Sequence, residues 1–296
     1  MRILVIKYGG LGDTLTIIPA LNLLKKNLEV QIEISINPFY KELTETFADT
    51  VSEFNISSFN EKNFDKYDHI FCLISSIKST LYKTIMKFSC RNIFYIDISE
   101  CEAKIESVYS FIIEKMFTAL NIKTPEMSDQ TDFYPLIQPL DKKIYLSGRN
   151  AMGKARSKII LPEKKEFSAI EEENYKKKYL LHPGSGGKKK NLSPDELESV
   201  IKKIAITPLN TDILIGPAEY GDEFIRKKFR GFRIFENIMD FSVLISIIKN
   251  HDFYIGYDSG ISHLAALCGV EGIVFFKIDN SEIWKPFSKK FIIEHK

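Results

Sequence analysis

Apolar positions along the chain follow two different periods in turn, which predicts strands alternating with helices. In the first half, short apolar runs rich in β-branched residues predict strands at 2–7, 30–35, 68–73 and 92–96. Apolar residues that recur every three or four positions predict helices from Thr14 onward and at 40–47, 79–88 and 107–120. Strands that alternate with helices indicate a mostly parallel sheet with both faces covered.

The second half repeats this alternation after a stretch of different character. Residues 124–167 contain several prolines and mixed charges with few periodic runs, and we place the crossing between two domains around 155–170. A lysine-rich helical segment is predicted at 171–178. Further strands are predicted at 179–182, 212–215, 253–257 and 272–276, and helices at 193–206, 222–228, 241–249 and 262–267. The pattern predicts an α/β protein of two Rossmann-like domains, residues 1–160 and 161–296, that share one cleft.

Composition narrows the class of protein. The 296 residues are 44% hydrophobic and 27% charged, as in ordinary globular proteins, and no apolar run approaches the 18 residues of a membrane span. The opening apolar run is too short for a signal peptide, so we expect a cytoplasmic protein. A net charge of +2 argues against nucleic acid as a partner. The four cysteines show no CxxC spacing, so we expect neither a metal site nor a disulfide.

The first candidate for chemistry is the glycine turn after the first strand. The segment Gly9-Gly10-Leu11-Gly12-Asp13 is only part of a dinucleotide-binding fingerprint, because Leu15 stands where the third glycine is required. Asp13 has two interpretations. It caps the helix that follows, or it presents a carboxylate at the carboxyl end of a parallel sheet, where α/β proteins bind ligands.

A second glycine-rich loop follows the strand predicted at 179–182. Glycines including Gly186 let backbone N–H groups approach an anion, Ser185 adds a hydroxyl, and Lys188, Lys189 and Lys190 add positive charge. This combination favours a phosphate or pyrophosphate over a merely solvated lysine loop. The segment is not a P-loop, because GxxxxGK[ST] is absent.

Two more strands end in polar residues. Glu219 follows the strand at 212–215 and is either an acceptor for sugar hydroxyls or a surface turn residue. Asp258 follows the strand at 253–257, and the backbone N–H groups of Ser259 and Gly260 begin a helix that favours a diphosphate. His263 lies in the first turn of that helix, where it either donates to a phosphate or is a neutral histidine held by the backbone.

Taken in order, these segments resemble glycosyltransferase family 9, the ADP-heptose:lipopolysaccharide heptosyltransferases. The opening strand and turn, the loop His182–Gly186 with Lys190, the segment Gly216–Glu219, the segment Asp258–Ala266 and the closing Trp284 and Pro286 carry the resemblance. It implies a GT-B fold, an inverting mechanism and no required metal or other cofactor. It also implies a nucleotide-sugar donor, ADP-heptose by family, on the second domain and a glycan or glycolipid acceptor on the first.

The resemblance also implies roles for individual residues. Asp13 is the implied general base, on a loop with Gly10 and Gly12 on the acceptor side. The implied nucleotide-sugar site comprises Ser185, Gly186, Lys190, Glu219, Asp258, Ser259, Gly260 and His263. Within it, Lys190, Ser185 and the amides at 259–260 stabilise the departing diphosphate, and Glu219 and Asp258 hold the ribose or donor sugar. Lys188 and Lys189 are the alternatives to Lys190 for the contact with the diphosphate.

Other functions stay open at this level. A GT-B enzyme that uses a UDP or GDP sugar, a sugar-nucleotide epimerase and a catalytically silent sugar-nucleotide-binding protein have the same architecture. A nicotinamide dehydrogenase is disfavoured by Leu15. A lipid-anchored acceptor implies a peripheral contact with the inner membrane, although the sequence contains no long basic amphipathic helix.

Overall fold

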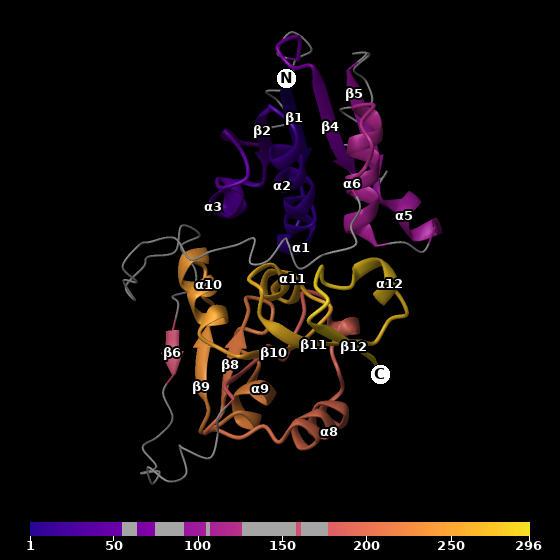
Figure 1. Ribbon diagram of the computed structural model, residues 1–296. Helices are drawn as coiled ribbons and strands as arrows, with labels where there is room; N and C mark the ends of the chain where they lie inside the picture. Colours follow the sequence, from indigo (N-terminus) through magenta and orange to yellow (C-terminus); the bar gives the residue numbers. More distant parts are fainter. Residues whose placement is uncertain (55–63, 75–91, 105–106, 126–157, 161–176) are drawn as a thin grey trace. The chain divides into compact units, whose positions relative to one another are not determined.

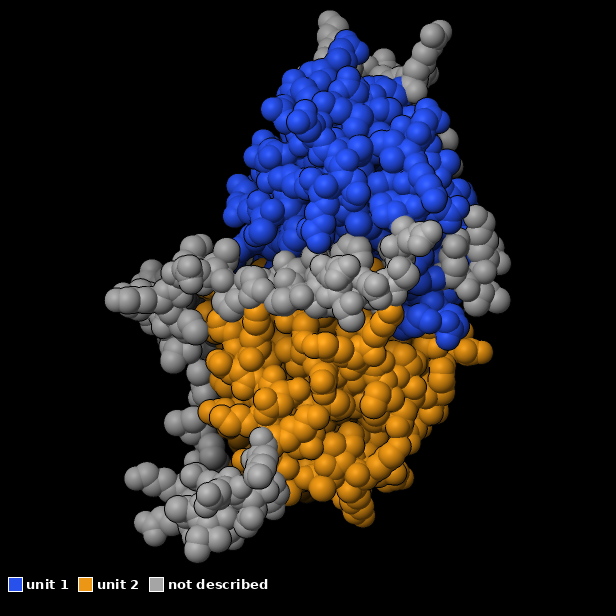
Figure 2. Space-filling model, viewed as in Figure 1, with its two compact units in different colours: residues 1–129, 282–285 blue, residues 130–281, 286–296 orange. Residues whose placement is uncertain are grey.

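A computed structural model describes residues 1–54, 64–74, 92–104, 107–125, 158–160 and 177–296 (Figure 1). The chain divides into two compact units, coloured separately in Figure 2. The first comprises residues 1–129 and 282–285, and the second comprises residues 130–281 and 286–296. The sequence places the boundary after residue 160. That boundary stays a prediction, because most of the predicted crossing lies outside the described residues.

The first unit is built on a five-stranded parallel sheet with the order β3-β2-β1-β4-β5. Its strands are β1 (Arg2–Lys7), β2 (Gln31–Ile36), β3 (Thr50–Glu53), β4 (His69–Ile74) and β5 (Ile93–Asp97). Its helical segments are α1 (Leu11–Leu15), α2 (Ile18–Asn27), η1 (Pro38–Tyr40), α3 (Lys41–Thr44), α5 (Ile98–Lys104) and α6 (Val108–Ala119). Helix α2 packs against α6.

Strand β1 is the centre of this unit and is buried on both faces. Leu4 and Ile6 point into a core cluster with residues of β4, while Ile3 and Val5 are fully buried on the opposite face. A parallel strand covered on both faces is expected to read as a continuous apolar run, as β1 does. Lys7 ends this run and is itself fully buried.

The second unit contains a seven-stranded sheet with the order β12-β11-β10-β7-β8-β9-β6. Its strands are β6 (Lys158–Ile160), β7 (Tyr179–Leu181), β8 (Thr211–Ile215), β9 (Arg233–Glu236), β10 (Phe253–Tyr257), β11 (Glu271–Phe276) and β12 (Phe291–His295). All pair in parallel except β6, which runs antiparallel to β9. Its helical segments are η5 (Lys188–Lys190), α8 (Pro194–Ile204), α9 (Glu223–Lys228), α10 (Phe241–Lys249) and α11 (Gly260–Leu267). The short α12 (Ser281–Trp284) follows β11. Its Ser281 belongs to the second unit, and its remaining residues belong to the first.

Both sheets reverse their direction of growth at a central strand. In the first, the chain builds outward from β1 through β2 to β3 and then continues on the other side with β4. In the second, it builds from β7 through β8 to β9 and then continues with β10 on the other side of β7. Each reversal is a topological switch point, where α/β proteins bind ligands beyond the carboxyl ends of the strands. This order confirms the predicted α/β class with two Rossmann-like units.

Most predicted elements are present, with shifted ends. The helix predicted from Thr14 begins earlier, at Leu11, and is interrupted before α2. The helix predicted at 40–47 is a short 3-10 turn and a single helical turn. Strands β3, β6, β9 and β12 were not predicted, because they are short or lie near sheet edges. The helix predicted at 79–88 and most of that at 171–178 lie outside the described residues.

Candidate functional site

Asp13 lies at the carboxyl end of β1, beside the switch point of the first sheet. It is the third residue of α1, and its Oδ2 accepts a hydrogen bond from the Gly10 backbone N–H at 3.2 Å. A Cβ at residue 9 would lie 2.6 Å from the Asp13 Cβ, so the aspartate packs directly on Gly9. The N-cap residue of α1 is therefore Gly10 and not Asp13, but the Asp13 side chain does take part in capping the helix through the Gly10 amide. The Asp13 side chain is 29% exposed.

A buried lysine that the sequence analysis did not single out contacts this aspartate. Lys7 Nζ lies 3.2 Å from Asp13 Oδ1, and the Lys7 side chain is fully buried. Burial lowers the pKa of the Lys7 amine, and the charge of Asp13 opposes that effect. Burial also raises the pKa of Tyr40, with the negative charge of Asp13 as the next cause, so this phenol lies near the carboxylate. The only feature of the sequence that could have pointed to Lys7 is that a charged residue ends an apolar strand.

In the second unit, three predicted loops converge at the carboxyl ends of the strands. They follow β7, β8 and β10, which are neighbours in the order β10-β7-β8. Because parallel strands end at the same edge, the loops at 182–190, 216–219 and 258–263 emerge together. The sequence predicted each loop separately, and the strand order brings them side by side.

The loop after β7 is tied to the loop after β10 by an ion pair. Lys190 Nζ lies 2.5 Å from Asp258 Oδ2, and Asp258 is almost fully buried. Ser185 is also buried, and its hydroxyl lies 2.7 Å from Asn191 Oδ1 and 3.0 Å from the Gly187 carbonyl. Ser185 therefore orders the loop from within. A Cβ at Gly186 would meet no atom within 4 Å, so this glycine faces open space.

Glu219 packs its carboxyl group against the backbone of two loops. A Cβ at residue 184 would lie 2.2 Å from its Cδ, and one at residue 216 would lie 3.0 Å from its Oε2. Glu219 is buried, and burial raises the pKa of its carboxyl group. The hydrogen bonds of the Glu219 and Gly216 backbone amides lower this pKa, but by less. His182 lies beneath, with Nδ1 2.8 Å from the Leu214 carbonyl oxygen, and burial lowers its pKa to about 4. Gly184 thus leaves the space that the Glu219 carboxyl group occupies, whereas a Cβ at Gly216 would make only a tight contact with it.

The amino end of α11 faces the same edge of the sheet. Ser259 caps the helix, with Oγ 3.4 Å from the Ser262 backbone nitrogen. Ser262 Oγ in turn lies 3.1 Å from the Tyr254 hydroxyl and donates to the Tyr257 carbonyl. His263, in the first turn, is buried. These bonds fix the first turn of α11, whose leading amides belong to Gly260 and its neighbours.

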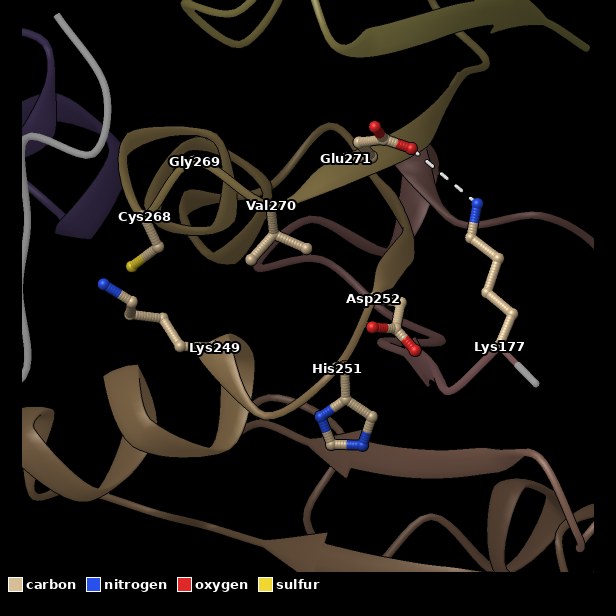
Figure 3. Close-up of a pocket in the computed structure, with 8 residues that line it drawn as sticks. All are labelled: Lys177, Lys249, His251, Asp252, Cys268, Gly269, Val270 and Glu271. Atoms are coloured by element: carbon tan, nitrogen blue, oxygen red, sulfur yellow. Dashed lines mark ion pairs between the residues drawn. The ribbon is translucent and has the colours of Figure 1, made fainter. Parts of the chain in front are cut away.

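A separate pocket lies at the opposite edge of the second sheet (Figure 3). It has a volume of about 420 Å³ and is lined by Lys177, Lys249, His251, Asp252, Cys268, Gly269, Val270 and Glu271. Its polar groups are engaged with the protein. Lys177 pairs with Glu271, the Asp252 carboxylate accepts from the Lys178 amide, and both His251 nitrogens lie within 2.8 Å of oxygen atoms. This pocket contains none of the predicted site residues.

Metal-binding chemistry was not predicted for this chain. Within the part that the structure describes, no group of three or more His, Cys, Asp and Glu side chains could hold a metal ion. Cys72 and Cys268 are buried, and burial raises the pKa of each thiol to about 12. Both behave as small apolar side chains. None of the helices described there is both long and apolar enough to cross a bilayer.

Comparison with known proteins gives a family and a fold. Residues 149–294 match the model of glycosyltransferase family 9 (heptosyltransferase). Heptosyltransferase WaaC of E. coli, solved with ADP, is 12% identical with a TM-score of 0.62, covering 100% of this chain and 93% of that one. A glycosyl transferase family 9 protein of Veillonella parvula is 15% identical with a TM-score of 0.66, covering 99% and 86%. ADP-heptose lps heptosyltransferase II of E. coli is 14% identical with a TM-score of 0.62, covering 99% and 90%. No curated protein sequence matches.

The similar structures extend over nearly the whole chain and confirm the predicted GT-B fold. The chain is a glycosyltransferase. Its residues 149–294 carry the domain of glycosyltransferase family 9, the heptosyltransferases, as the ordered motifs predicted.

Proposed function

We propose that this glycosyltransferase is an inverting, metal-independent enzyme that transfers heptose from ADP-heptose to a lipopolysaccharide-core or other glycan acceptor. The observation that carries the proposal is the convergence of three polar loops at the switch point of the second sheet. They bring together a lysine, two buried carboxyl groups and the amino end of α11. Two similar solved structures contain ADP and ADP-2-deoxy-2-fluoro heptose, which supports an adenine nucleotide as the donor.

The donor would bind at this edge of the second sheet. The amides of Ser259 and Gly260 and the ammonium of Lys190 would bind the diphosphate, since helix N-termini and cations both favour anions. Gly186 leaves open space for the phosphates above the loop. Glu219 and Asp258 would accept hydrogen bonds from hydroxyl groups of the ribose or the sugar. Ser185 would order the loop, and His263 would support the diphosphate.

The reaction is a single displacement at the anomeric carbon. Asp13 would take the proton of an acceptor hydroxyl as its oxygen attacks that carbon. A carbon–oxygen bond forms on one face, the bond to the diphosphate oxygen breaks on the other, and ADP leaves with both electrons of that bond. Attack opposite the leaving group inverts the anomeric configuration. The flanking glycines, Gly10 and Gly12, would keep the acceptor side of Asp13 open.

Metal independence is proposed because the chain itself supplies positive charge and amide donors that would stabilise the departing diphosphate. Lys190 is a compact cation suited to phosphate, and the fixed amides of α11 require no reorganisation during the reaction. Activity that persists after EDTA treatment tests this part of the proposal. Loss of activity with EDTA and recovery with a divalent cation would contradict it.

The donor is tested by calorimetric titration of the protein with ADP, UDP, GDP and NAD without added metal. Selective binding of ADP is the expected result. Preference for UDP or GDP would replace the donor and keep the fold assignment, whereas binding of NAD alone would contradict the proposal.

The base is tested with Asp13→Asn. Transfer to heptose-deficient lipopolysaccharide should be abolished while ADP affinity is unchanged, since Asp13 acts on the acceptor. Full turnover by this variant would remove Asp13 from the mechanism. An acceptor of this kind is lipid-anchored, so we also propose a cytoplasmic enzyme with peripheral contact to the inner membrane.

A further inference from the structure

The ion pair between Lys7 and Asp13 differs from a simple surface ion pair in the burial of its lysine and in the donors that its carboxylate receives. Lys7 is fully buried at the end of the central strand β1, and its Nζ lies 3.2 Å from Asp13 Oδ1. The other oxygen of the carboxylate, Oδ2, lies 3.2 Å from the Gly10 backbone nitrogen. Each carboxylate oxygen therefore has its own donor, and the two donors come from opposite ends of the turn.

The turn between these residues is shaped to keep the contact. A Cβ at residue 9 would lie within 2.8 Å of three atoms of the Asp13 side chain, so only glycine leaves room for the aspartate. In the pairing of β1, Lys7 lies between Ile36 of β2 and Leu73 of β4, two buried apolar residues. Burying an ammonium among apolar residues is costly unless it is paired, and Asp13 provides that pairing.

We propose that Lys7 is a positioning residue for the general base, holding the Asp13 carboxylate ionised and in one orientation. This inference rests on the proposed role of Asp13 as the base. A positive charge within about 4–6 Å favours the ionised form of a carboxylate, which is the form able to accept a proton. Because Lys7 is buried, solvent screens the pair less than it screens exposed pairs. With both oxygens fixed, the exposed side of Asp13 meets the acceptor hydroxyl in one geometry.

Tyr40 of η1 also lies near this carboxylate in the described part of the chain. The negative charge of Asp13 adds to burial in raising the pKa of Tyr40, and Tyr8 has a smaller effect in the same direction. Because its pKa is raised, the Tyr40 phenol carries no charge near pH 7. Among the described residues, Lys7 is the cation that the structure places against Asp13.

The experiment follows the Asp13 carboxyl carbon by NMR across a pH titration, in the full chain. Its signal is assigned by its loss in Asp13→Asn. In Lys7→Met, the titration midpoint is expected to rise by at least one pH unit, a tenfold gain in proton affinity. An unchanged or lower midpoint would overturn the proposal. If Lys7→Met does not fold, Lys7→Gln removes the charge while keeping a donor.

The chain offers a matched control. Lys25 Nζ also lies 3.2 Å from an aspartate oxygen, Asp49 Oδ1, but this pair is partly exposed. Lys25→Met should leave the Asp13 midpoint unchanged. If it moves the midpoint as much as Lys7→Met does, the effect is a general change of charge and the proposal fails.

Activity separates this inference from the proposed function. In Lys7→Met, the acid limb of kcat/KM for ADP-heptose and heptose-deficient lipopolysaccharide should move to higher pH, with ADP affinity unchanged. Lys7→Arg, which keeps the charge, should restore the wild-type limb. If Asp13→Asn stays active, the base assignment fails whatever Lys7 does. If Asp13→Asn is inactive but Lys7→Met keeps the wild-type pH profile, the positioning role alone fails.

Discussion

The ammonium of Lys190 lies 2.5 Å from Oδ2 of Asp258 and so joins the loop after β7 to the loop after β10. These two strands flank the switch point of the second sheet. Asp258 is almost fully buried, whereas Lys190 is 37% exposed. The lysine therefore compensates a buried carboxylate while its ammonium stays within reach of a ligand.

Lys190→Ala is predicted to weaken ADP binding 10- to 100-fold. This corresponds to the loss of about 1–3 kcal/mol for a charge-assisted hydrogen bond. The melting temperature should also fall, because Asp258 loses its compensating charge. Calorimetry and thermal unfolding measure the two effects. Lys189→Ala is the matched control, since Lys189 is an exposed neighbour in the same 3-10 turn. Equal losses in both variants would show that the loop acts only through its net charge.

Gly184→Ala is predicted to destabilise the second unit and impair ADP binding. The added Cβ would lie 2.2 Å from the Glu219 Cδ, so either the loop or the glutamate must move. Such overpacking costs about 1–3 kcal/mol. The same substitution at Gly186 meets no atom within 4 Å and should leave the melting temperature nearly unchanged. Wild-type stability of Gly184→Ala would mean that Glu219 does not pack on this loop.

The stability of the protein is predicted to fall with acid through His182. Burial lowers the pKa of His182 from its ordinary value of 6.5 to about 4. Between these values the unfolded chain binds a proton that the folded chain does not, so the free energy of unfolding falls as pH decreases from about 6.5 to about 4. The slope from this group is at most about 1.4 kcal/mol per pH unit.

Denaturant unfolding at several pH values measures this slope. In His182→Phe, which cannot titrate, the slope over that interval should be shallower than in the wild type, even though the variant loses the contact with Leu214. Parallel curves for the two proteins would contradict the assignment of the acid sensitivity to His182.

Ser193→Ala is predicted to destabilise helix α8, which follows the loop at 182–190. Ser193 Oγ accepts from the Glu196 backbone N–H, and Glu196 Oε2 accepts from the Ser193 backbone N–H at 2.6 Å. Loss of such a cap costs about 0.5–2 kcal/mol. Ser193→Thr keeps the hydroxyl and should retain most of the stability. Denaturant unfolding compares the variants, and equal destabilisation by Ala and Thr would argue against the cap.

Local pattern was sufficient to predict the main helices and buried strands. The runs at β1, β4 and β10 are apolar and short, and the helix at 107–120 repeats its apolar positions on one face. In these segments the apolar pattern itself indicates which positions are buried. The same reasoning failed for β9, a four-residue strand bounded by Arg233 and Glu236, because charged ends obscure so short a run.

The sequence by itself determined the alternation of strands and helices, the order of the loops and the residue types that they carry, because these depend on neighbours along the chain. Only the tertiary structure decided which of those residues meet. Lys190 reaches Asp258, and Glu219 lies on Gly184, because β7 is placed between β10 and β8. Strand order follows from packing of the whole sheet, which no local pattern specifies. The burial of Lys7 against Asp13 was likewise decided by the two strands that flank β1.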